Sequence, residues 1–486
     1  MINYTVEPSL VRWRRTKIIA TIGPASKSEK KIEKLLQLGV NLFRINMSHG
    51  DHEQHRAMVK RIRSITKRLN RHVAILMDLC GPKIRVGTFD NGSMMLKDGD
   101  SVVVNCIKCQ GPGVIHSQYP DLYKDVRSGE RILLDDGNIE LEVEQVVDKA
   151  VHCRVIYGGK LSDHKGMNLP DSSVSTVSFT DKDKKDAEVA IELEADFLAL
   201  SFVRTGQDIQ DLNQFLASHG ADIPVIAKIE KPEAVTNLDA ILEESYGIMV
   251  ARGDLGIELP AQKVPLIQRE LISRARYANK PVIVATQMLE SMISNARPTR
   301  AEVGDVANAA LLGTDAVMLS AETASGKHPI KAVKMMDSVL REIEQYQWRQ
   351  DSFVSIEDGH RQRDLSSVRK AVSHAVTMLA RELNLLGIVI PTMTGTTARI
   401  LAADRPLAPL LAVCANERIS RRLALHWGIV SLDSEQHVRG DWKDLCEIVC
   451  DKFEHDHEGK SVLLVSGFND DPLLNEPVMK IVRLNK

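Results

Sequence analysis

Two apolar runs near the middle of the chain end in charged residues of the kinds that do chemistry. Residues 223–230 end on Lys228 and Glu230, and residues 248–254 end on arginine, glycine and Asp254. Buried strands prefer Val and Ile, and a charge inside one is unfavourable, so charges where each strand stops indicate a site at the strand ends. The two carboxylates could hold a hard cation such as Mg²⁺, with the Lys228 ammonium beside it. The alternative is that these charges only solvate the rim of a sheet.

The same pattern, an apolar run that ends in polar residues, recurs along the chain and argues against a merely solvated rim. Six further runs lie at 17–22, 41–50, 73–78, 196–202, 281–287 and 315–322. Stretches with helical periodicity separate most of them, including 28–38, 54–69 and 265–279. Eight alternating units with polar residues at the strand ends favour an α/β fold, a (β/α)₈ TIM barrel with its active site on that face. A doubly wound open sheet is the competing arrangement.

The barrel pattern stops between residues 83 and 170. Short strand-like segments separated by turn residues take over, at 101–105, 131–134, 139–143 and 151–156. We therefore expect the barrel to comprise residues 1–83 and 171–348, with a small β-barrel domain at 84–170 inserted after its third strand. Loops that follow strands lie on the catalytic face, so the insertion is expected to be a lid that excludes water on closure. The alternative is an insertion without a catalytic role.

A third region, 349–486, is expected to form a separate α/β domain after a polar linker at 349–364. Its apolar runs lie at 386–391, 410–414 and 461–465. The first run leads into a turn rich in hydroxyl groups and glycine, with Thr392, Thr394, Gly395, Thr396 and Thr397. A strand, such a turn and a helix start can cradle a phosphate group, because backbone N–H groups and the helix N-terminus favour an anion. A threonine-rich helix cap would give part of the same pattern.

The composition is that of an ordinary globular chain. Lys+Arg number 63 and Asp+Glu 65, a net charge of −2, so nothing indicates a nucleic-acid or membrane partner. No apolar run reaches the roughly 20 residues needed to span a bilayer, and we expect no secretory signal. The cluster of Arg12, Arg14, Arg15 and Lys17 is expected to be solvated. The seven scattered cysteines suit a reducing cytoplasm, and the Cys106/Cys109 and Cys446/Cys450 pairs are not expected to bind metal.

Eight motifs resemble the pyruvate kinase family, and they occur in that family's order. They lie at 16–24, 44–50, 78–85, 165–170, 228–230, 251–256, 285–292 and 318–324. The resemblance runs through the whole chain and is loosest in the C-terminal region. It implies a bacterial, allosterically regulated phosphotransferase of glycolysis, which transfers phosphate from phosphoenolpyruvate to ADP through a Mg-stabilised enolate. It also implies a cytoplasmic homotetramer.

The resemblance assigns roles to the charged strand ends. It implies that Glu230 and Asp254 ligate Mg²⁺, with Mn²⁺ as an alternative, and that Arg44 and Lys228 contact the phosphoryl group. The remaining residues that match the family's substrate, proton-transfer and nucleotide positions are Gly253 and Asp254 for the substrate carboxylate, Thr286, Ser320 and Glu322 for proton transfer, and Asn46, Ser48, His49 and Arg85 for the nucleotide.

The chain departs from the family pattern around the potassium site, whose matching positions are Asn46, Ser48, Asp78 and Leu79. Potassium-dependent members carry a Thr-Lys pair after the aspartate and a glutamate before Ile-Arg, whereas this chain has Leu79, Cys80 and Lys83. A lysine ammonium can replace a monovalent cation, so we expect no potassium requirement. The alternative is that Lys83 turns outward to solvent and potassium still binds.

Two further departures concern the nucleotide and the effector. A basic position of the family in the helix after the lid is Glu188 here, although Lys182, Lys184 and Lys185 are close. The last loop, 465–475, carries Asp470 and Asp471, which would repel a doubly phosphorylated sugar. A sugar monophosphate or AMP is therefore expected as effector rather than fructose bisphosphate.

Two rival functions remain open at this stage. A Mg²⁺-enolate barrel such as a pyruvate aldolase would use a similar carboxylate pair but would not need the inserted lid. A non-catalytic sensor would keep only the C-terminal phosphate site, and it would be recognised by a lost lysine or carboxylate.

Overall fold

The computed structural model describes residues 14–105, 111, 113–172, 174–350, 353, 368–433, 441–452 and 459–484. Arg12, the Cys106/Cys109 pair, the side chain of Cys450 and nearly all of the 349–364 linker lie outside this part of the chain. No helix in the described part is long and apolar enough to cross a membrane.

Eight parallel strands close into a barrel, which confirms the TIM-barrel prediction and excludes the open sheet. The strands are β1 (Lys17–Thr21), β2 (Leu42–Asn46), β3 (Ala74–Asp78), β12 (Phe197–Leu200), β13 (Val225–Ile229), β14 (Gly247–Ala251), β15 (Val282–Ala285) and β16 (Ala316–Leu319). The first strand pairs with β2 on one side and with β16 on the other, and this second pairing closes the ring.

The strands are buried on both faces because alternate side chains point into the barrel and out toward the helices. In β1, Ile19 packs with the barrel interior, whereas Ile18 and Ala20 belong to the larger core under the helices. The main helices around the barrel are α2 (Glu29–Gln37), α3 (His52–Arg68), α5 (Asp181–Glu192), α6 (Gly206–Ser218), α8 (Leu238–Glu244), α10 (Val264–Tyr277), α11 (Arg300–Leu311) and α13 (Pro329–Arg349). Two-sided burial explains why the strand sequences are continuous apolar runs.

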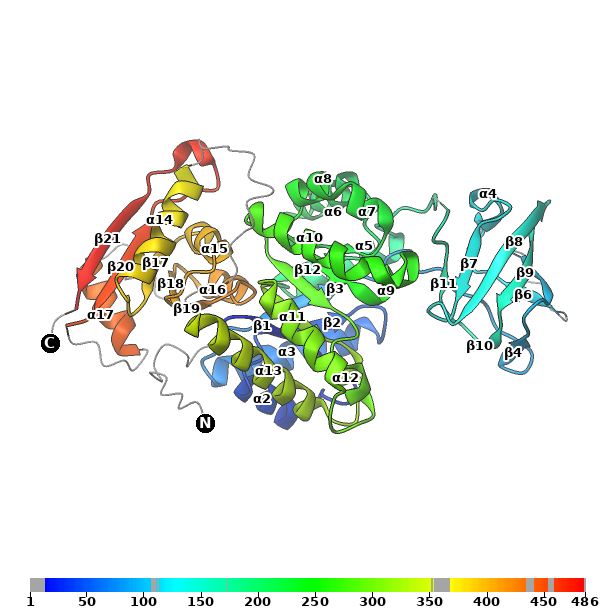
Figure 1. The fold of residues 1–486 in the computed structure, drawn as a ribbon, viewed down its shortest axis with the longest axis horizontal. Helices are drawn as coiled ribbons and strands as arrows, with labels where there is room; N and C mark the ends of the chain where they lie inside the picture. The colour runs from blue at the N-terminus through cyan, green and yellow to red at the C-terminus, as the bar shows by residue number, and fades with distance from the viewer. Residues whose placement is uncertain are drawn as a thin grey trace.

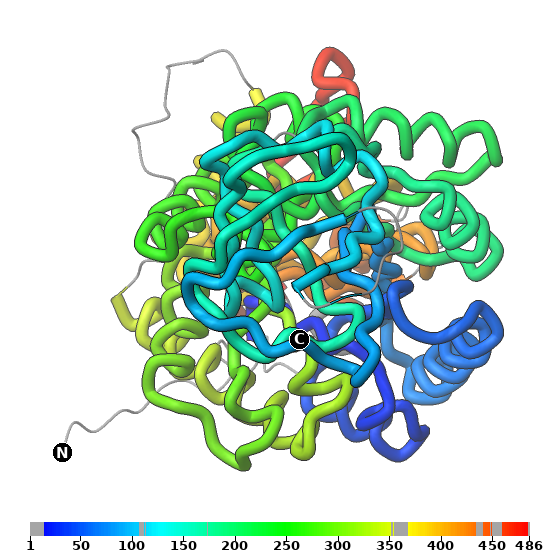
Figure 2. The backbone as a smooth tube through the Cα atoms, turned by 90° about the vertical axis from the view of Figure 1, so that its right-hand side faces the viewer, coloured from blue at the N-terminus to red at the C-terminus, as the bar shows by residue number. Residues whose placement is uncertain are grey.

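The insertion after β3 is built from short strands and stands beyond one end of the barrel (Figure 1). Its strands are β4 (Ser93–Leu96), β5 (Ser101–Asn105), β6 (Val114–His116), β7 (Arg131–Leu134), β8 (Ile139–Val147), β9 (Ala150–Tyr157), β10 (Gly159–Ser162) and β11 (Met167–Asn168). In the described residues they form a six-stranded sheet and a two-stranded ribbon around a core of their own. Viewed from that side, the insertion lies in front of the barrel (Figure 2).

The C-terminal region forms a five-stranded sheet at the opposite end of the barrel (Figure 1). Its strands are β17 (Ile388–Thr392), β18 (Leu410–Cys414), β19 (Ile429–Asp433), β20 (Ser461–Ser466) and β21 (Val478–Arg483), with helices α14 (Val368–Glu382), α15 (Thr396–Ala403), α16 (Glu417–Leu423) and α17 (Trp442–Lys452). Lys17 Nζ donates to the Ile429 carbonyl at 2.7 Å, so this domain contacts the amino end of β1. Arg14, Arg15 and Lys17 are buried, so the expectation that this cluster is solvated was wrong. The insertion and the C-terminal domain thus flank opposite ends of the barrel.

Candidate active site

The two charged runs lie on adjacent strands. Lys228 on β13 is in register with Met249 on β14, so the strands end side by side. Glu230 follows β13, and Asp254 lies in the first turn of α9 (Arg252–Glu258), which begins directly after β14. Because all eight strands are parallel, these ends meet on the catalytic face of the barrel.

Asp78, at the end of β3, organises the positive charges. One carboxylate oxygen of Asp78 accepts from Arg44 Nε at 2.6 Å, and the other lies 3.4 Å from Lys228 Nζ. Lys228 Nζ also lies 2.9 Å from Glu230 Oε1 and donates to Ser201 Oγ at 2.7 Å. Arg44 and Lys228, which come from strands far apart in sequence, are therefore held together by one buried carboxylate.

The charges of this cluster stabilise one another against burial. Desolvation would raise the pKa of Asp78, but Arg44 and Lys228 outweigh it, so this pKa lies below its ordinary value. Desolvation would lower the pKa of Lys228, but Asp78 and Glu230 outweigh it and raise this pKa. Lys228 is therefore a fixed positive charge over the whole physiological range.

Glu230 and Asp254 repel each other in a manner that suits a bound cation. Burial is the largest cause that raises the pKa of Glu230, and the charge of Asp254 raises it further against the effect of Lys228. A divalent cation between two such carboxylates would relieve this repulsion. The described residues contain no group of three or more His, Cys, Asp or Glu side chains placed to hold a metal. A pair of carboxylates fits Mg²⁺, which commonly binds one or two of them together with waters and substrate oxygens.

The loop after β15 brings Thr286 against the start of α9. Thr286 and Gln287 have φ angles of 64° and 53°, in the left-handed region that few non-glycine residues adopt. The Gly253 N–H donates to Thr286 Oγ1 at 2.7 Å. This N–H, which was expected to receive the substrate carboxylate, is therefore shared with the Thr286 hydroxyl.

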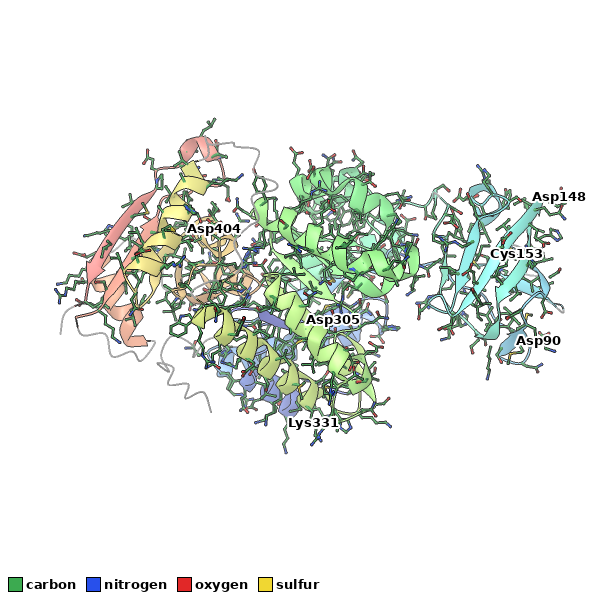
Figure 3. All side chains as sticks on the ribbon, viewed as in Figure 1. Asp90, Asp148, Cys153, Asp305, Lys331 and Asp404 are labelled. Carbon is green, nitrogen blue, oxygen red and sulfur yellow. The ribbon has the colours of Figure 1, made fainter. Side chains whose placement is uncertain are left out.

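Arg252 supports this loop and does not join the charged cluster. Its guanidinium donates to the Thr286 carbonyl at 2.7 Å and lies 2.5 Å from Asp305 of α11. Figure 3 labels Asp305 on its helix at the outside of the barrel. Arg252 thus fixes the strained backbone of Thr286 from behind.

Ser320 and Glu322 lie at the start of α12 (Ala321–Ala324), after β16. Glu322 is fully buried, and its two oxygens accept from the backbone N–H groups of Ser320 at 2.7 Å and Leu289 at 3.2 Å. Burial raises the pKa of Glu322. Glu322 therefore joins the loop after β15 to the loop after β16.

Three of the residues that match the nucleotide positions, Asn46, Ser48 and His49, lie at the end of β2 and in the turn that follows it. The Ser48 N–H donates to Asn46 Oδ1 at 3.1 Å, and His49 is exposed beside them. Lys182 in α5 reaches the carbonyl of Met47 in this turn at 2.9 Å, whereas Glu188 of the same helix is exposed. Arg85 lies in the insertion, where it donates to the His164 carbonyl at 3.0 Å.

Lys83 lies at the stem of the insertion. Its side chain is exposed, and its Cε lies 3.7 Å from where a Cβ on Gly166 would be. The ion partners of Asp78 are Arg44 and Lys228. The described geometry corresponds to the alternative in which Lys83 faces solvent.

Glu258, the last residue of α9, joins the insertion to the barrel. Its Oε1 accepts from Asn168 Nδ2 of β11 at 2.9 Å and from Lys231 Nζ at 2.7 Å. Since Gly253 near the start of α9 bonds to Thr286, one short helix contacts the loop after β15 at its start and the insertion at its end.

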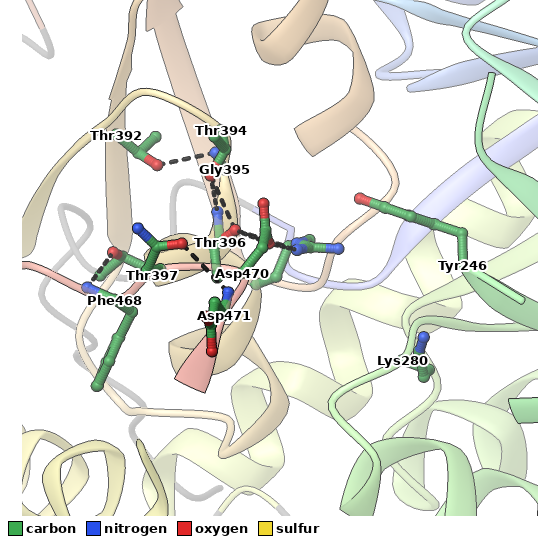
Figure 4. Close-up of polar contacts among 12 residues, drawn as sticks. Tyr246, Lys280, Thr392, Thr394, Gly395, Thr396, Thr397, Phe468, Asp470 and Asp471 are labelled. Carbon is green, nitrogen blue, oxygen red and sulfur yellow. Dashed lines mark hydrogen bonds and ion pairs between the residues drawn. The ribbon is translucent and has the colours of Figure 1, made fainter. Parts of the chain in front are cut away.

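The threonine-rich turn of the C-terminal domain leads from β17 into α15. Gly395 has a φ of 88° and precedes the helix, and its N–H donates to Thr392 Oγ1 at 2.9 Å. Thr394 Oγ1 and Thr396 Oγ1 lie 2.8 Å apart, and Thr397 Oγ1 accepts from the Phe468 N–H at 3.3 Å (Figure 4). Four hydroxyl groups therefore gather around one helix start.

The sequence interpretation missed three residues. Asp78 was assigned only to the potassium site, although it anchors Arg44 and Lys228. Ser201, which contacts Lys228, and Glu258 were not considered. A polar residue directly after β12 could have indicated Ser201, whereas no local pattern indicates that Glu258 contacts a segment 90 residues earlier in sequence.

Comparison with known proteins gives one consistent result. A family model described as pyruvate kinase, barrel domain, matches residues 13–333, and one described as pyruvate kinase, alpha/beta domain, matches residues 370–477. The chain is 48% identical over 424 residues to pyruvate kinase 2 of Synechocystis sp., covering 86% of this chain and 70% of the relative. It is 38% identical over 469 residues to pyruvate kinase of Clostridium perfringens, covering 94% and 96%.

A solved structure is similar along almost the whole chain. The crystal structure of a pyruvate kinase from Cryptosporidium parvum aligns with a TM-score of 0.88 and 35% identity, covering 98% of this chain and 97% of that one.

Proposed function

We propose that the charged cluster at the strand ends carries out the reaction of this chain, which belongs to the pyruvate kinase family. The chain transfers phosphate from phosphoenolpyruvate to ADP. The observation that carries this assignment is the contact of Lys228 Nζ with Glu230 at 2.9 Å, beside Asp78 and its Arg44 partner. Phosphoryl transfer needs preorganised positive charge around the moving group. Lys228 and Arg44 supply this charge in a largely buried site.

Each remaining residue of the site has a proposed task. Lys228 stabilises the negative charge that develops on the enolate oxygen, and Arg44 orients the phosphoryl group. The backbone at Gly253 and Asp254 binds the substrate carboxylate, with Thr286 close to the carbon that is protonated. Ser320 and Glu322 hold the loop behind it.

The metal and nucleotide are assigned to neighbouring groups. Glu230 and Asp254 would hold Mg²⁺, or Mn²⁺, which supplies positive charge beside the substrate oxygens when bound. Asn46, Ser48, His49 and Arg85 would contact the nucleotide, and the family's basic contact at the position of Glu188 is not carried over. The insertion at 84–170 would close over both substrates between barrel segments 1–83 and 171–348, with 349–486 as the effector domain.

The assay that tests this assignment is pyruvate formation from phosphoenolpyruvate with ADP and Mg²⁺ each present or absent. We expect pyruvate only when both are present. Cleavage or formation of a carbon–carbon bond would favour the aldolase alternative, and complete inactivity would favour a sensor. We further propose that the protein is cytoplasmic and forms a homotetramer. Sedimentation of the purified chain would test the oligomeric state.

We predict that turnover persists without potassium. Leu79 has no hydroxyl, and Lys83 offers a tethered ammonium that would compete with a bound cation for the same place. The proposal requires Lys83 to turn from the lid stem toward Asp78 when the site is filled. Turnover should be compared in sodium- and potassium-free buffer with a bulky organic counter-ion, before and after adding potassium. A tenfold or greater rise would refute it, and Lys83→Glu should create a partial potassium requirement.

We predict that the C-terminal domain binds a phosphorylated metabolite with one phosphate, such as a sugar monophosphate or AMP, rather than fructose bisphosphate. The turn from Thr392 to Thr397 offers hydroxyl groups and the start of α15 to one phosphate. Calorimetry with these ligands should detect binding, and the Thr394→Ala, Thr396→Ala double variant should lose both binding and activation. Full activation of the double variant would remove this hypothesis.

A further inference from the structure

The phosphate-binding turn already contains an anion that belongs to the chain itself. Asp470 Oδ1 accepts from the hydroxyl of Thr396 and from Arg399 Nη2 at 2.9 Å (Figure 4). Arg399 Nη2 also donates to Thr396 Oγ1 at 3.2 Å. One carboxylate oxygen therefore takes the hydroxyl and guanidinium donors that a phosphate oxygen would use.

The loop that carries Asp470 is held in this place from two sides. Arg369 Nη2 donates to the carbonyls of Asn469 and Asp470, the latter at 2.9 Å. The Phe468 N–H donates to Thr397 Oγ1 at 3.3 Å. The loop is thus bonded to the turn at Thr396 and Thr397 and to α14 through Arg369.

The site has more donors than one carboxylate uses. The Nε atoms of Arg369 and Arg399 are buried and have no hydrogen-bond partner among the described residues. A buried N–H without an acceptor is unfavourable. A phosphoryl group, which offers three acceptor oxygens and up to two negative charges, could engage these donors where a single carboxylate does not.

The neighbouring aspartate serves a different purpose. Asp471 accepts from the Leu473 N–H at 2.9 Å and begins the short helix η4 (Pro472–Leu474). The sequence led us to expect that both adjacent aspartates repel a second phosphate, but their contacts give them different roles. Asp470 occupies the turn, whereas Asp471 stabilises the loop.

Arg399 also connects the turn to the barrel. Its guanidinium lies 5.1 Å from the centre of the Tyr246 ring. The Tyr246 hydroxyl is 2.7 Å from His426 Nε2, and the Tyr246 N–H donates to the Val225 carbonyl at 2.8 Å. Tyr246 directly precedes β14 and bonds to the start of β13, the two strands that end at Asp254 and Glu230. Arg399 thus contacts both Asp470 and Tyr246, and Tyr246 is bonded to the amino end of β13 and precedes β14.

We propose that Asp470 is a tethered competitor for the phosphate site, which a phosphorylated effector must displace in order to bind Thr396 and Arg399. This inference rests on the proposed effector function of the turn. A carboxylate on a short loop has an effective concentration on the order of millimolar, so it lowers the affinity of this site for every anionic ligand. Ligands whose phosphate also engages the remaining arginine donors are selected over weaker anions.

The test is calorimetric titration of the full-length protein with inorganic phosphate and with glucose 6-phosphate. Asp470→Asn removes the competing charge, and we expect it to bind both ligands at least about tenfold more tightly than the wild type. Asp471→Asn is the matched control, since it removes the same charge one residue away, and its affinity should stay within about twofold. Asp470→Ala should bind at least as tightly as Asp470→Asn, and thermal unfolding checks that all variants are folded.

The outcomes separate this inference from the function on which it rests. If the wild type binds and both Asp470 variants bind equally or more weakly, Asp470 is not a competitor while the effector site stands. If Asp471→Asn strengthens binding as much as Asp470→Asn, the effect is general repulsion and displacement is refuted. If no form of the protein binds either ligand, the effector function and this inference both fail.

Discussion

Replacing Lys228 by methionine is expected to lower turnover by at least about 10²–10³-fold while the protein remains folded. Removing one preorganised charge from a site that stabilises a developing oxyanion typically has an effect of this size. Lys228 contacts both Asp78 and Glu230, so its loss also removes the positive charge that holds these two carboxylates in place. The measurement is steady-state turnover of phosphoenolpyruvate and ADP at saturating Mg²⁺.

Lys280→Met provides a matched control for this prediction. Lys280 is also largely sheltered, but it donates to the Ser245 carbonyl at 2.7 Å, near the amino end of β15 and away from the strand ends. Its replacement should leave turnover within a few-fold of the wild type. Retention of more than a tenth of wild-type turnover by Lys228→Met, with an unchanged unfolding temperature, would contradict the assignment of Lys228.

The second large effect is expected for the two carboxylates. Glu230→Gln and Asp254→Asn should each lower turnover and raise the Mg²⁺ concentration needed for half-maximal activity. Groups in the outer shell of a metal already change affinity by about 10–100-fold, so a direct ligand should change it by at least as much. Direct titration with Mn²⁺, followed calorimetrically, measures the same loss without relying on turnover.

The raised pKa of Glu230 adds a pH dependence to this prediction. Because burial and Asp254 favour the protonated form, protons compete with the metal as the pH falls, and affinity should decrease toward acid pH. Glu230→Gln should flatten this dependence. Unchanged metal titration curves in both variants would show that neither residue is a ligand.

The barrel was predictable because its physical signals are local. Each strand is a largely apolar run that ends in a polar residue or is followed directly by one, and the eight predicted runs match the eight observed strands with small differences at their ends. Strands with weak signals were missed, such as β21, which pairs antiparallel to β20 and leaves five of its six residues exposed, and β11, which has two residues. A short or exposed strand has no continuous apolar run.

The sequence predicted only those features of the site that follow from the type of a residue and from its position after a strand. Lys228 and Glu230 were recognised because charges at the end of a buried strand are unusual. The pairing of Arg44 with Asp78, and the sharing of the Gly253 N–H with Thr286, depend on which strands are neighbours in the closed barrel. The occupation of the threonine turn by Asp470 joins residues 74 positions apart, and no spacing rule predicts it.

The two ends of the inserted domain lie side by side, since the Met167 N–H donates to the Ile84 carbonyl at 3.0 Å. Strands β3 and β12 pair directly, so the barrel closes whether the connecting segment is long or short. A disordered loop of this length would add a loop-closure entropy that grows with the logarithm of its length, whereas a folded segment with adjacent ends adds little beyond that of a short turn. The inserted domain therefore sets no length that the barrel must accommodate, and the register between β3 and β12 is independent of how many residues are folded between Ile84 and Met167.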